Sequence, residues 1–508
     1  MMFNILTYLE KSAAQYPDKI AFADKDKSIT YEELVKRSKG IGSQLAKQFS
    51  PRTPIPVFME KSVDTISLFF GIVYAGCFYV LLDTKQPKTR LDHILNTLNV
   101  NTLITSTGYD RDLKKIEFAG KVIYLEELEE DNVINENSLM KIKEQALDTD
   151  PLYGIFTSGS TGIPKGVIVA HRSVIDFIDV FTETFGITSE DVIGNQAPWD
   201  FDVSVKDIYS TIATGATMQI IPKQFFSFPT KLIDFLCERE VTTIIWAVSA
   251  ICIISTLKGF EYKVPTKLNK IMFSGEVMPV KQLNIWREYL PDAMYVNLYG
   301  PTEITCNCTY HIIKEDYEPG DVIPIGKPFP NEHVFLLDDE NKEVKEPGKK
   351  GELCVSGTAV TLGYYNNSEQ TQKAFTQNPL NPYYLETIYR TGDLAYYNEN
   401  GLLCFASRKD FQIKHMGHRI ELGEIEGSME SIHEIKRACC IFENNKIHAF
   451  YDGAIDKKEI VRGLKKTLPV FMIPNVFIQV EQFPITKNGK IDRTELKKKI
   501  EGEDVVQA

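Results

Sequence analysis

The chain has no excess of basic residues. Its 508 residues include 57 Lys and Arg against 69 Asp and Glu, which gives a net charge of −12. A surface that binds nucleic acid needs clustered cations, so this balance argues against nucleic acid as a principal partner. The short basic groups at 349–350 and 497–499 are better explained as solvated faces.

Paired cysteine motifs are also missing. None of the nine cysteines belongs to a CxxC pair, and Cys306 and Cys308 have no second half that would complete a zinc site. No basic segment followed by a long apolar run stands at the N-terminus, so no secretory leader is expected. A reduced, cytoplasmic chain is the simplest interpretation.

Long uncharged runs are scarce, and one of them needs an explanation. Residues 65–82 include no charged side chain and approach the length of a membrane-spanning helix. Gly71 and Gly76 are expected to interrupt this run, so that a helix ends near Ala75. Residues 78–82 have the apolar signature of a buried parallel strand. The segment is therefore predicted to belong to the core, and no membrane partner is expected.

What the chain does have is apolar content and regular alternation. It is 43% hydrophobic and 25% charged, and it is long enough for two or more cores. Helical and strand-like segments alternate, with strands expected at 152–156, 218–221 and 270–273. This alternation predicts a layered α/β architecture.

The most informative segment is 156–166, which reads Phe-Thr-Ser-Gly-Ser-Thr-Gly-Ile-Pro-Lys-Gly. Glycine lets backbone N–H groups approach an anion, the hydroxyls add donors, and Lys165 can neutralise a phosphate oxygen. The segment therefore predicts a phosphate cradle at a strand end. A GxxxxGK[ST] P-loop is excluded because Gly166, not a hydroxyl residue, follows the lysine. Taken alone, the segment could also be an ordinary Gly/Ser surface loop.

Four further blocks follow in order. They are Asn-Leu-Tyr-Gly-Pro-Thr-Glu at 297–303, Tyr-Arg-Thr-Gly-Asp-Leu at 389–394, a long block at 412–426 and Asn-Gly-Lys-Ile-Asp-Arg at 488–493. Together with the phosphate cradle they resemble the AMP-forming adenylating enzymes, which include acyl-CoA ligases, luciferases and the adenylation domains of nonribosomal peptide synthetases. The resemblance spans nearly the whole chain.

This resemblance implies an α/β fold in two parts. A large multi-subdomain N-terminal domain of layered sheets and helices would cover residues 1–409 and hold the ATP and amino acid pocket. A small mobile α+β C-terminal domain, residues 410–508, would carry a catalytic lysine. Asp410 would be the hinge about which the small domain rotates between two half-reactions.

The implied chemistry is the activation of a carboxylic acid by ATP with magnesium. The acid attacks the α-phosphorus and expels pyrophosphate, so cations and oriented donors must converge on the phosphates. The resemblance implies that Lys490, Thr302, Glu303 and Lys165 are catalytic, with Glu303 binding the metal and Lys490 bridging the acid and the phosphate. Without the neighbouring 491–493, Lys490 would be read as a surface group in a Lys-rich tail.

The resemblance also assigns nucleotide contacts. Tyr299 would stack on the adenine, and the acceptor-only carboxylate of Asp393 would bind both ribose hydroxyls. The full ATP-binding set that it implies is Thr157, Ser158, Gly159, Ser160, Thr161, Gly162, Gly275, Glu276, Asn297, Leu298, Tyr299, Gly300, Thr302, Asp393, Phe405, Arg408 and Lys490.

The segment 195–209 bears on which acid is activated. It is similar to the Phe-Asp-x-Ser segment of amino-acid-activating members, in which the aspartate, here Asp202, pairs with the substrate's α-ammonium. A buried carboxylate needs a cationic partner, which an amino acid supplies and a fatty acid does not. The implied substrate pocket consists of Asp202, Val203, Lys206, Ile245, Met272, Ser274, Leu298, Cys306 and Asn307.

Residues 273–279 and 203–209 look closest to the stand-alone D-alanine carrier-protein ligases of cell-wall teichoic acid modification. Lys206 departs from what alanine would need, because an inward-facing ammonium suits a polar or acidic side chain. An outward-facing Lys206 is the alternative. The sequence leaves the substrate's side chain open.

We therefore predict a ligase that forms aminoacyl-AMP and transfers the acyl group to the phosphopantetheine thiol of a carrier protein. The carrier is expected in trans, because no phosphopantetheine-attachment segment follows Asp492. An acyl-CoA or aryl-CoA ligase is an alternative that Asp202 disfavours. A nucleotide-binding protein without turnover is a second alternative, which the joint presence of the catalytic set disfavours.

Overall fold

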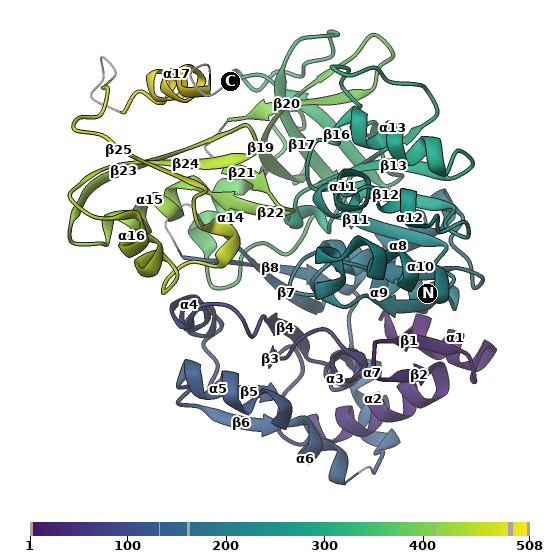
Figure 1. The fold of residues 1–508 in the computed structure, drawn as a ribbon. Helices are drawn as coiled ribbons and strands as arrows, with labels where there is room; N and C mark the ends of the chain where they lie inside the picture. The colour runs from purple at the N-terminus through teal and green to yellow at the C-terminus, as the bar shows by residue number, and fades with distance from the viewer. Residues whose placement is uncertain (1–3, 132, 160–162, 410–411, 486–490, 505–508) are drawn as a thin grey trace.

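The computed structural model describes residues 4–131, 133–159, 163–409, 412–485 and 491–504, apart from the side chains of 501–504 (Figure 1). Within these ranges the largest sheet has nine strands in the order β15-β14-β13-β12-β11-β9-β10-β1-β2. Its strands from β13 to β1 run parallel. The bounds are β1 (Ile20–Ala23), β2 (Ser28–Thr30), β9 (Val192–Asn195), β10 (Thr217–Ile220), β11 (Thr243–Ala247), β12 (Lys270–Ser274), β13 (Met294–Tyr299), β14 (Thr309–Ile313) and β15 (Lys327–Pro328).

A second, six-stranded sheet has the order β6-β5-β3-β4-β7-β8 and is parallel up to β7, which pairs with β8 in the antiparallel sense. Its strands are β3 (Pro54–Phe58), β4 (Phe78–Leu82), β5 (Thr102–Thr105), β6 (Lys121–Tyr124), β7 (Pro151–Thr157) and β8 (Lys165–Ala170). The strands predicted at 152–156, 218–221 and 270–273 are confirmed as β7, β10 and β12.

Three smaller sheets follow in the chain. The first is antiparallel and comprises β16 (Glu332–Leu337), β17 (Gly351–Gly357), β18 (Phe375–Gln377), β19 (Thr387–Tyr397) and β20 (Leu403–Arg408). The other two lie in the C-terminal part and comprise β21 (Gln412–His415) with β22 (His418–Glu421), and β23 (Ile435–Glu443), β24 (Lys446–Gly453) and β25 (Val476–Gln479).

Helices connect and cover these sheets (Figure 1). The α-helices are α1 (Leu6–Gln15), α2 (Tyr31–Leu45), α3 (Val63–Tyr74), α4 (Lys88–Leu98), α5 (Asp110–Ile116), α6 (Leu125–Glu130), α7 (Glu136–Gln145), α8 (His171–Phe185), α9 (Val203–Thr214), α10 (Pro229–Glu238), α11 (Val248–Thr256), α12 (Gly259–Tyr262), α13 (Val280–Tyr289), α14 (Ser368–Ala374), α15 (Leu422–Glu430), α16 (Lys457–Leu464) and α17 (Arg493–Asp504). Short 3₁₀ turns are η1 (Thr107–Tyr109), η2 (Lys223–Ser227), η3 (Thr302–Ile304) and η4 (Val470–Met472).

The cores follow the predicted division into a large and a small part. The largest hydrophobic cluster joins both parallel sheets with α2, α3, α8 and α9, and a second cluster packs α10, α11 and α13 on the other face of the nine-stranded sheet. The C-terminal elements have cores of their own, built from buried residues between Ile420 and Ile500. The α/β fold class is therefore confirmed.

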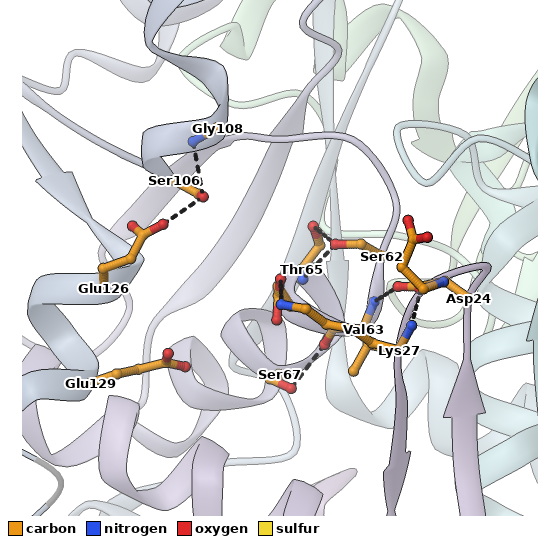
Figure 2. Close-up of polar contacts among 12 residues, drawn as sticks. Asp24, Lys27, Ser62, Val63, Thr65, Ser67, Ser106, Gly108, Glu126 and Glu129 are labelled. Carbon is orange, nitrogen blue, oxygen red and sulfur yellow. Dashed lines mark hydrogen bonds and ion pairs between the residues drawn. The ribbon is translucent and has the colours of Figure 1, made fainter.

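The uncharged run 65–82 is part of the largest core. It forms α3 and β4, as predicted, and α3 begins at a polar cap. Ser62 Oγ accepts from the N–H of Thr65 at 3.2 Å, and Asp24 Oδ2 accepts from the N–H of Val63 at 2.9 Å (Figure 2). In the described ranges no helix combines the length and the apolar character that crossing a bilayer requires.

The prediction that Gly71 interrupts this run is wrong. Gly71 lies inside α3, where α2 packs so closely that a Cβ atom would meet Ile41 Cγ2 at 2.5 Å. Gly76 does end the segment, because it has a φ of +72°, a backbone conformation that glycine adopts without strain. Gly71 thus allows α2 and α3 to pack closely, and Gly76 allows the chain to turn after α3.

Candidate functional site

The carboxyl ends of three adjacent parallel strands, β11, β12 and β13, form one wall of the site. Ile245 is paired with Met272, and Ser274 with Leu298. Cross-strand partners share a face of the sheet, and residues two apart on one strand do too, so all four predicted pocket residues line the same face. They are buried. Ligands of open α/β sheets bind at this strand end.

The start of α9 places a carboxylate opposite this wall. Asp202 is the N-cap residue of the helix, and its carboxylate accepts a hydrogen bond from the side chain of Thr302 in η3. Burial raises the pKa of Asp202, although the hydrogen bond from Thr302 and the charge of Lys206 oppose that effect. A cation bound beside Asp202 would offset the cost of its burial.

Lys206 lies one helical turn further along α9 and points inward. Its side chain is fully buried, and Nζ donates to Asn307 Oδ1 at 2.6 Å. Cys306, the neighbour of Asn307, is also buried, with its thiol pKa raised to about 12 by burial. The inward alternative for Lys206 is therefore the one that the fold adopts. Val203, the first residue of α9, lies between Asp202 and this turn.

A polar chain lies at the end of β13. The hydroxyl of Tyr299 donates to one carboxylate oxygen of Asp393 on β19, and Arg408 Nη1 donates to the other at 2.6 Å. All three side chains are largely or fully buried. The antiparallel register places Asp393 directly opposite Arg408 on β20, which explains their pairing. Phe405 lies on the same strand.

The β7–β8 hairpin carries the described part of the predicted phosphate cradle. Thr157 ends β7 and is paired with Lys165 at the start of β8, so the two ends of the glycine-rich segment lie side by side. Lys165 Nζ lies 5.5 Å from the centre of the Tyr364 ring. Ser158 Oγ donates to the carbonyl of Arg419 at 2.8 Å. Ser160, Thr161 and Gly162 lie outside the described residues.

Glu303 is a buried carboxylate with two partners. Its Oε1 accepts from the Tyr364 hydroxyl at 2.7 Å, and its Oε2 pairs with Arg419 Nη1 at 2.8 Å. Burial opposes ionisation, but the charge of Arg419 and the hydrogen bond from Tyr364 hold the pKa of Glu303 below its usual range. Neither partner was assigned a role from the sequence. Tyr364 lies in none of the motif blocks, and Arg419 lies in one without any local sign of its contact.

The β21–β22 hairpin of the C-terminal part faces this site (Figure 1). Lys414 Nζ lies 5.2 Å from the centre of the Tyr299 ring, the ring that was predicted to stack on adenine. The N–H of Gly417 donates to Glu276 Oε1 at 3.2 Å. Together with Arg419, these contacts bring three positions of one hairpin to the large domain.

A buried ion pair lies beside this hairpin. Glu424 of α15 pairs with Arg90 of α4 at 3.0 Å, and both side chains are at most 7% exposed. The C-terminal part contacts the predicted cradle through the carbonyl of Arg419, which accepts from Ser158 Oγ, and it contacts Glu303 through the Arg419 guanidinium.

The remaining predicted residues are dispersed around these groups. Gly275 follows β12 with a φ of +96°, and a Cβ there would meet open space. Asn297 Nδ2 donates to the carbonyl of Pro324 at 2.8 Å. Gly300 packs tightly against the backbone of 306–307. Asp410 and Lys490 lie outside the described residues.

Comparison with known proteins agrees with this arrangement. Residues 9–365 match the family described as AMP-binding enzyme. The chain is 31% identical to gramicidin S synthase 1 of Brevibacillus brevis over 96% of its own length and 44% of that protein. It is 29% identical to tyrocidine synthase 1 of Brevibacillus parabrevis over 97% of its own length and 45% of that protein. The chain thus spans about half the length of these curated relatives.

Solved structures share the fold. The adenylation domain AlmE of Vibrio cholerae, in complex with glycyl-adenosine-5'-phosphate, matches with a TM-score of 0.84 at 20% identity, over 99% of this chain and 98% of that one. Holo-PA1221, a protein with adenylation and PCP domains bound to a vinylsulfonamide inhibitor, matches with a TM-score of 0.80 at 23% identity, over 98% and 84%.

Proposed function

Because the chain belongs to the AMP-binding enzyme family, we propose that it is an ATP-dependent ligase that activates an amino acid as aminoacyl-AMP. The acyl group then passes to the phosphopantetheine thiol of a carrier protein. The observation that carries the amino acid assignment is Asp202, a carboxylate held at the start of α9 opposite the pocket wall. A substrate α-ammonium is the cation that offsets its burial.

The nucleotide occupies the carboxyl end of the nine-stranded sheet in this proposal. Asp393 accepts hydrogen bonds from the ribose hydroxyls, and Arg408 and Tyr299 hold its carboxylate in place. Thr157 and Lys165, paired at the base of the β7–β8 hairpin, hold the outer phosphates. Thr302 lies between the two ligands, beside Asp202, where the α-phosphate and the substrate carboxylate meet.

Magnesium fits Glu303 on one condition. Magnesium in such sites takes one or two carboxylates together with substrate phosphates, so a single buried carboxylate is a sufficient protein ligand. Arg419 and Tyr364 satisfy both oxygens of Glu303 in this arrangement, and Arg419 must leave before the carboxylate can face a cation. When bound, the metal would neutralise phosphate charge. Arg419 now occupies the place beside Glu303 that the metal would take, so binding of the metal requires Arg419 to move away.

The two half-reactions use different positions of the C-terminal part. We place the boundary at Asp410, and the separate core of residues 420–500 supports it. Figure 1 draws α17, which directly follows the Lys490 motif, at the outer end of this part, away from β7 and β8. With β21–β22 against the site, we assign the arrangement to the thioester-forming half-reaction. Adenylation would use a different orientation of the C-terminal part, in which Lys490 reaches the acid and the phosphate.

The test is amino-acid-dependent ATP–pyrophosphate exchange. The substrates are all L-amino acids, glycine, D-alanine, β-alanine and several aryl and fatty acids, and thioester formation on a phosphopantetheinylated carrier is measured with the preferred one. We expect exchange with at least one amino acid and with none of the acids that lack an amine. Exchange only with aryl or fatty acids would make the chain an acyl ligase. ATP binding without any exchange would make it a nucleotide-binding protein.

A further inference from the structure

The proposed substrate pocket includes a buried lysine, Lys206, whose charge the proposed adenylation chemistry does not use. Lys206 follows Asp202 by four residues on α9, so the two side chains lie on the same face, about 6 Å apart along the helix axis. Asp202 is half-buried at the start of the helix, whereas Lys206 is fully buried one turn deeper. An amino acid bound at Asp202 through its ammonium would direct its side chain toward this deeper turn.

The polar partner of Lys206 is neutral. Nζ donates to the amide oxygen of Asn307, which itself is 1% exposed. Across the described part of the chain, no carboxylate forms an ion pair with this ammonium. Of the other predicted pocket residues, Ile245 and Met272 are apolar, and Cys306, the neighbour of Asn307, is weakly polar; all three are buried. An ammonium has three donors, and a buried one that lacks a counter-charge is costly.

Asp207 does not supply the missing charge. Its Oδ2 accepts from Asn195 Nδ2 at 2.6 Å, and its Oδ1 is unpartnered. Burial raises the pKa of Asp207 to about 7, although Asn195, Lys206 and Lys61 act against that rise. Within the described residues Asp207 forms no ion pair with Lys206 or Lys61, and its charge acts on both lysines.

The charges then change when a substrate binds. Before binding, the field of Asp202 stabilises Lys206. The α-ammonium of a bound substrate would pair with Asp202. The reacting carboxylate loses its charge when it forms a mixed anhydride with the phosphate, so neither group remains as a counter-ion for Lys206. A neutral substrate side chain would leave Lys206 buried without a counter-ion, whereas a side-chain carboxylate would restore one pair for each charge.

We infer that the substrate is an α-amino acid with a side-chain carboxylate, which pairs with Lys206 and displaces or shares its bond to Asn307. This inference rests on the proposed function and adds the substrate class to it. Lys206 is the specificity-determining residue, Asp202 selects the amine, and aspartate- and glutamate-like acids are the class that satisfies both.

The first test compares acidic amino acids with their neutral isosteres in pyrophosphate exchange. We expect kcat/KM for aspartate or glutamate to exceed that for asparagine, glutamine, methionine, alanine and glycine by about 100-fold or more, since a broken buried pair costs several kcal/mol. Preference for any neutral amino acid would overturn the inference and leave the proposed function intact. Exchange only with acids that lack an amine would overturn both.

The second test assigns the preference to Lys206. Methionine has a volume similar to that of lysine but no charge. In Lys206→Met, the kcat/KM for the acidic amino acid divided by the kcat/KM for its side-chain amide should therefore fall about 100-fold. Both substrates are measured on one preparation, so partial unfolding cancels from the ratio. Lys61→Met is the control, because Lys61 is a second lysine whose charge acts on Asp207, but it is half-buried and donates to Asn195 and to the carbonyl of Gln196, outside the proposed pocket. An unchanged ratio in Lys206→Met, or an equal fall in the control, would overturn the assignment.

Discussion

On the proposed assignment, Asp202 and Lys206 divide the recognition of the substrate between two charges on one turn of helix. Asp202 is at the N-cap, beside Thr302, while Lys206 is fully buried one turn further along α9. The resemblance selected both positions as candidates. It could not predict which way Lys206 points, because that depends on how α9 packs against β9, β10 and β11.

The amine-selecting role of Asp202 predicts a specific defect. In Asp202→Asn, the isosteric amide loses its ion pair with the substrate, and kcat/KM for the preferred amino acid should fall by about 3 to 5 kcal/mol, or 100-fold or more. Pyrophosphate exchange measures the loss. ATP affinity, followed in the absence of amino acid, serves as the control and should stay within about threefold. An unchanged kcat/KM would rule out Asp202 as the partner of the ammonium.

At the scale of elements, local sequence predicted strands better than it predicted helix contacts. The apolar runs 78–82 and 152–156 are strands because their flanking turns and lengths allow little else. The prediction for Gly71 is wrong because the sequence alone does not distinguish a glycine that breaks a helix from one that lets a second helix pack closely. The close approach of Ile41 on α2 decides this case.

This packing predicts the result of adding one methyl group. Gly71→Ala would bring Cβ to within 2.5 Å of Ile41 Cγ2, so it should destabilise the large domain by overpacking, by about 1 to 3 kcal/mol. Denaturant unfolding measures the change. Gly427→Ala in α15 is a matched helical control whose Cβ would meet open space. That variant should be neutral or more stable by up to about 1 kcal/mol, because alanine is the better helix former. Equal stability of Gly71→Ala and wild type would contradict the packing argument.

At the scale of the whole molecule, contacts between distant segments could not be derived from the sequence. Arg90 and Glu424 are 334 positions apart, and Arg419 and Glu303 are 116 apart. The motif blocks suggested candidate nucleotide residues because each block is local. The contacts of the C-terminal part depend on how two separately packed bodies meet, which no local pattern reports.

The Arg90–Glu424 pair predicts that this docking depends on pH. Burial raises the pKa of Glu424 from 4.5 to about 7, with Glu421 adding to the rise and Arg90 opposing it. A carboxyl whose pKa is higher when docked takes up a proton on docking. Docking should therefore weaken as pH rises from about 4.5 to about 7.

Hydrogen exchange of the β21–β22 amides, corrected for intrinsic rates, measures this dependence at about pH 5.5 and about pH 7.5. Exchange should be faster at the higher pH in wild type. In Glu424→Gln most of that difference should disappear, because the amide does not titrate. Asp200, whose pKa burial also raises to about 7, remains in both proteins, so the comparison isolates Glu424. A full pH effect in the variant would contradict the role given to Glu424.

The hydrogen bond between Ser158 and Arg419 has a consequence for the direction of catalysis under the proposed function. Ser158 Oγ donates to the carbonyl of Arg419, so one hydroxyl of the proposed cradle is occupied by the C-terminal part, while the Arg419 guanidinium covers Glu303. Pyrophosphate would then compete with the docked C-terminal part for the cradle. Docking after pyrophosphate has left would hinder the return of the adenylate to ATP and favour its transfer to the thiol.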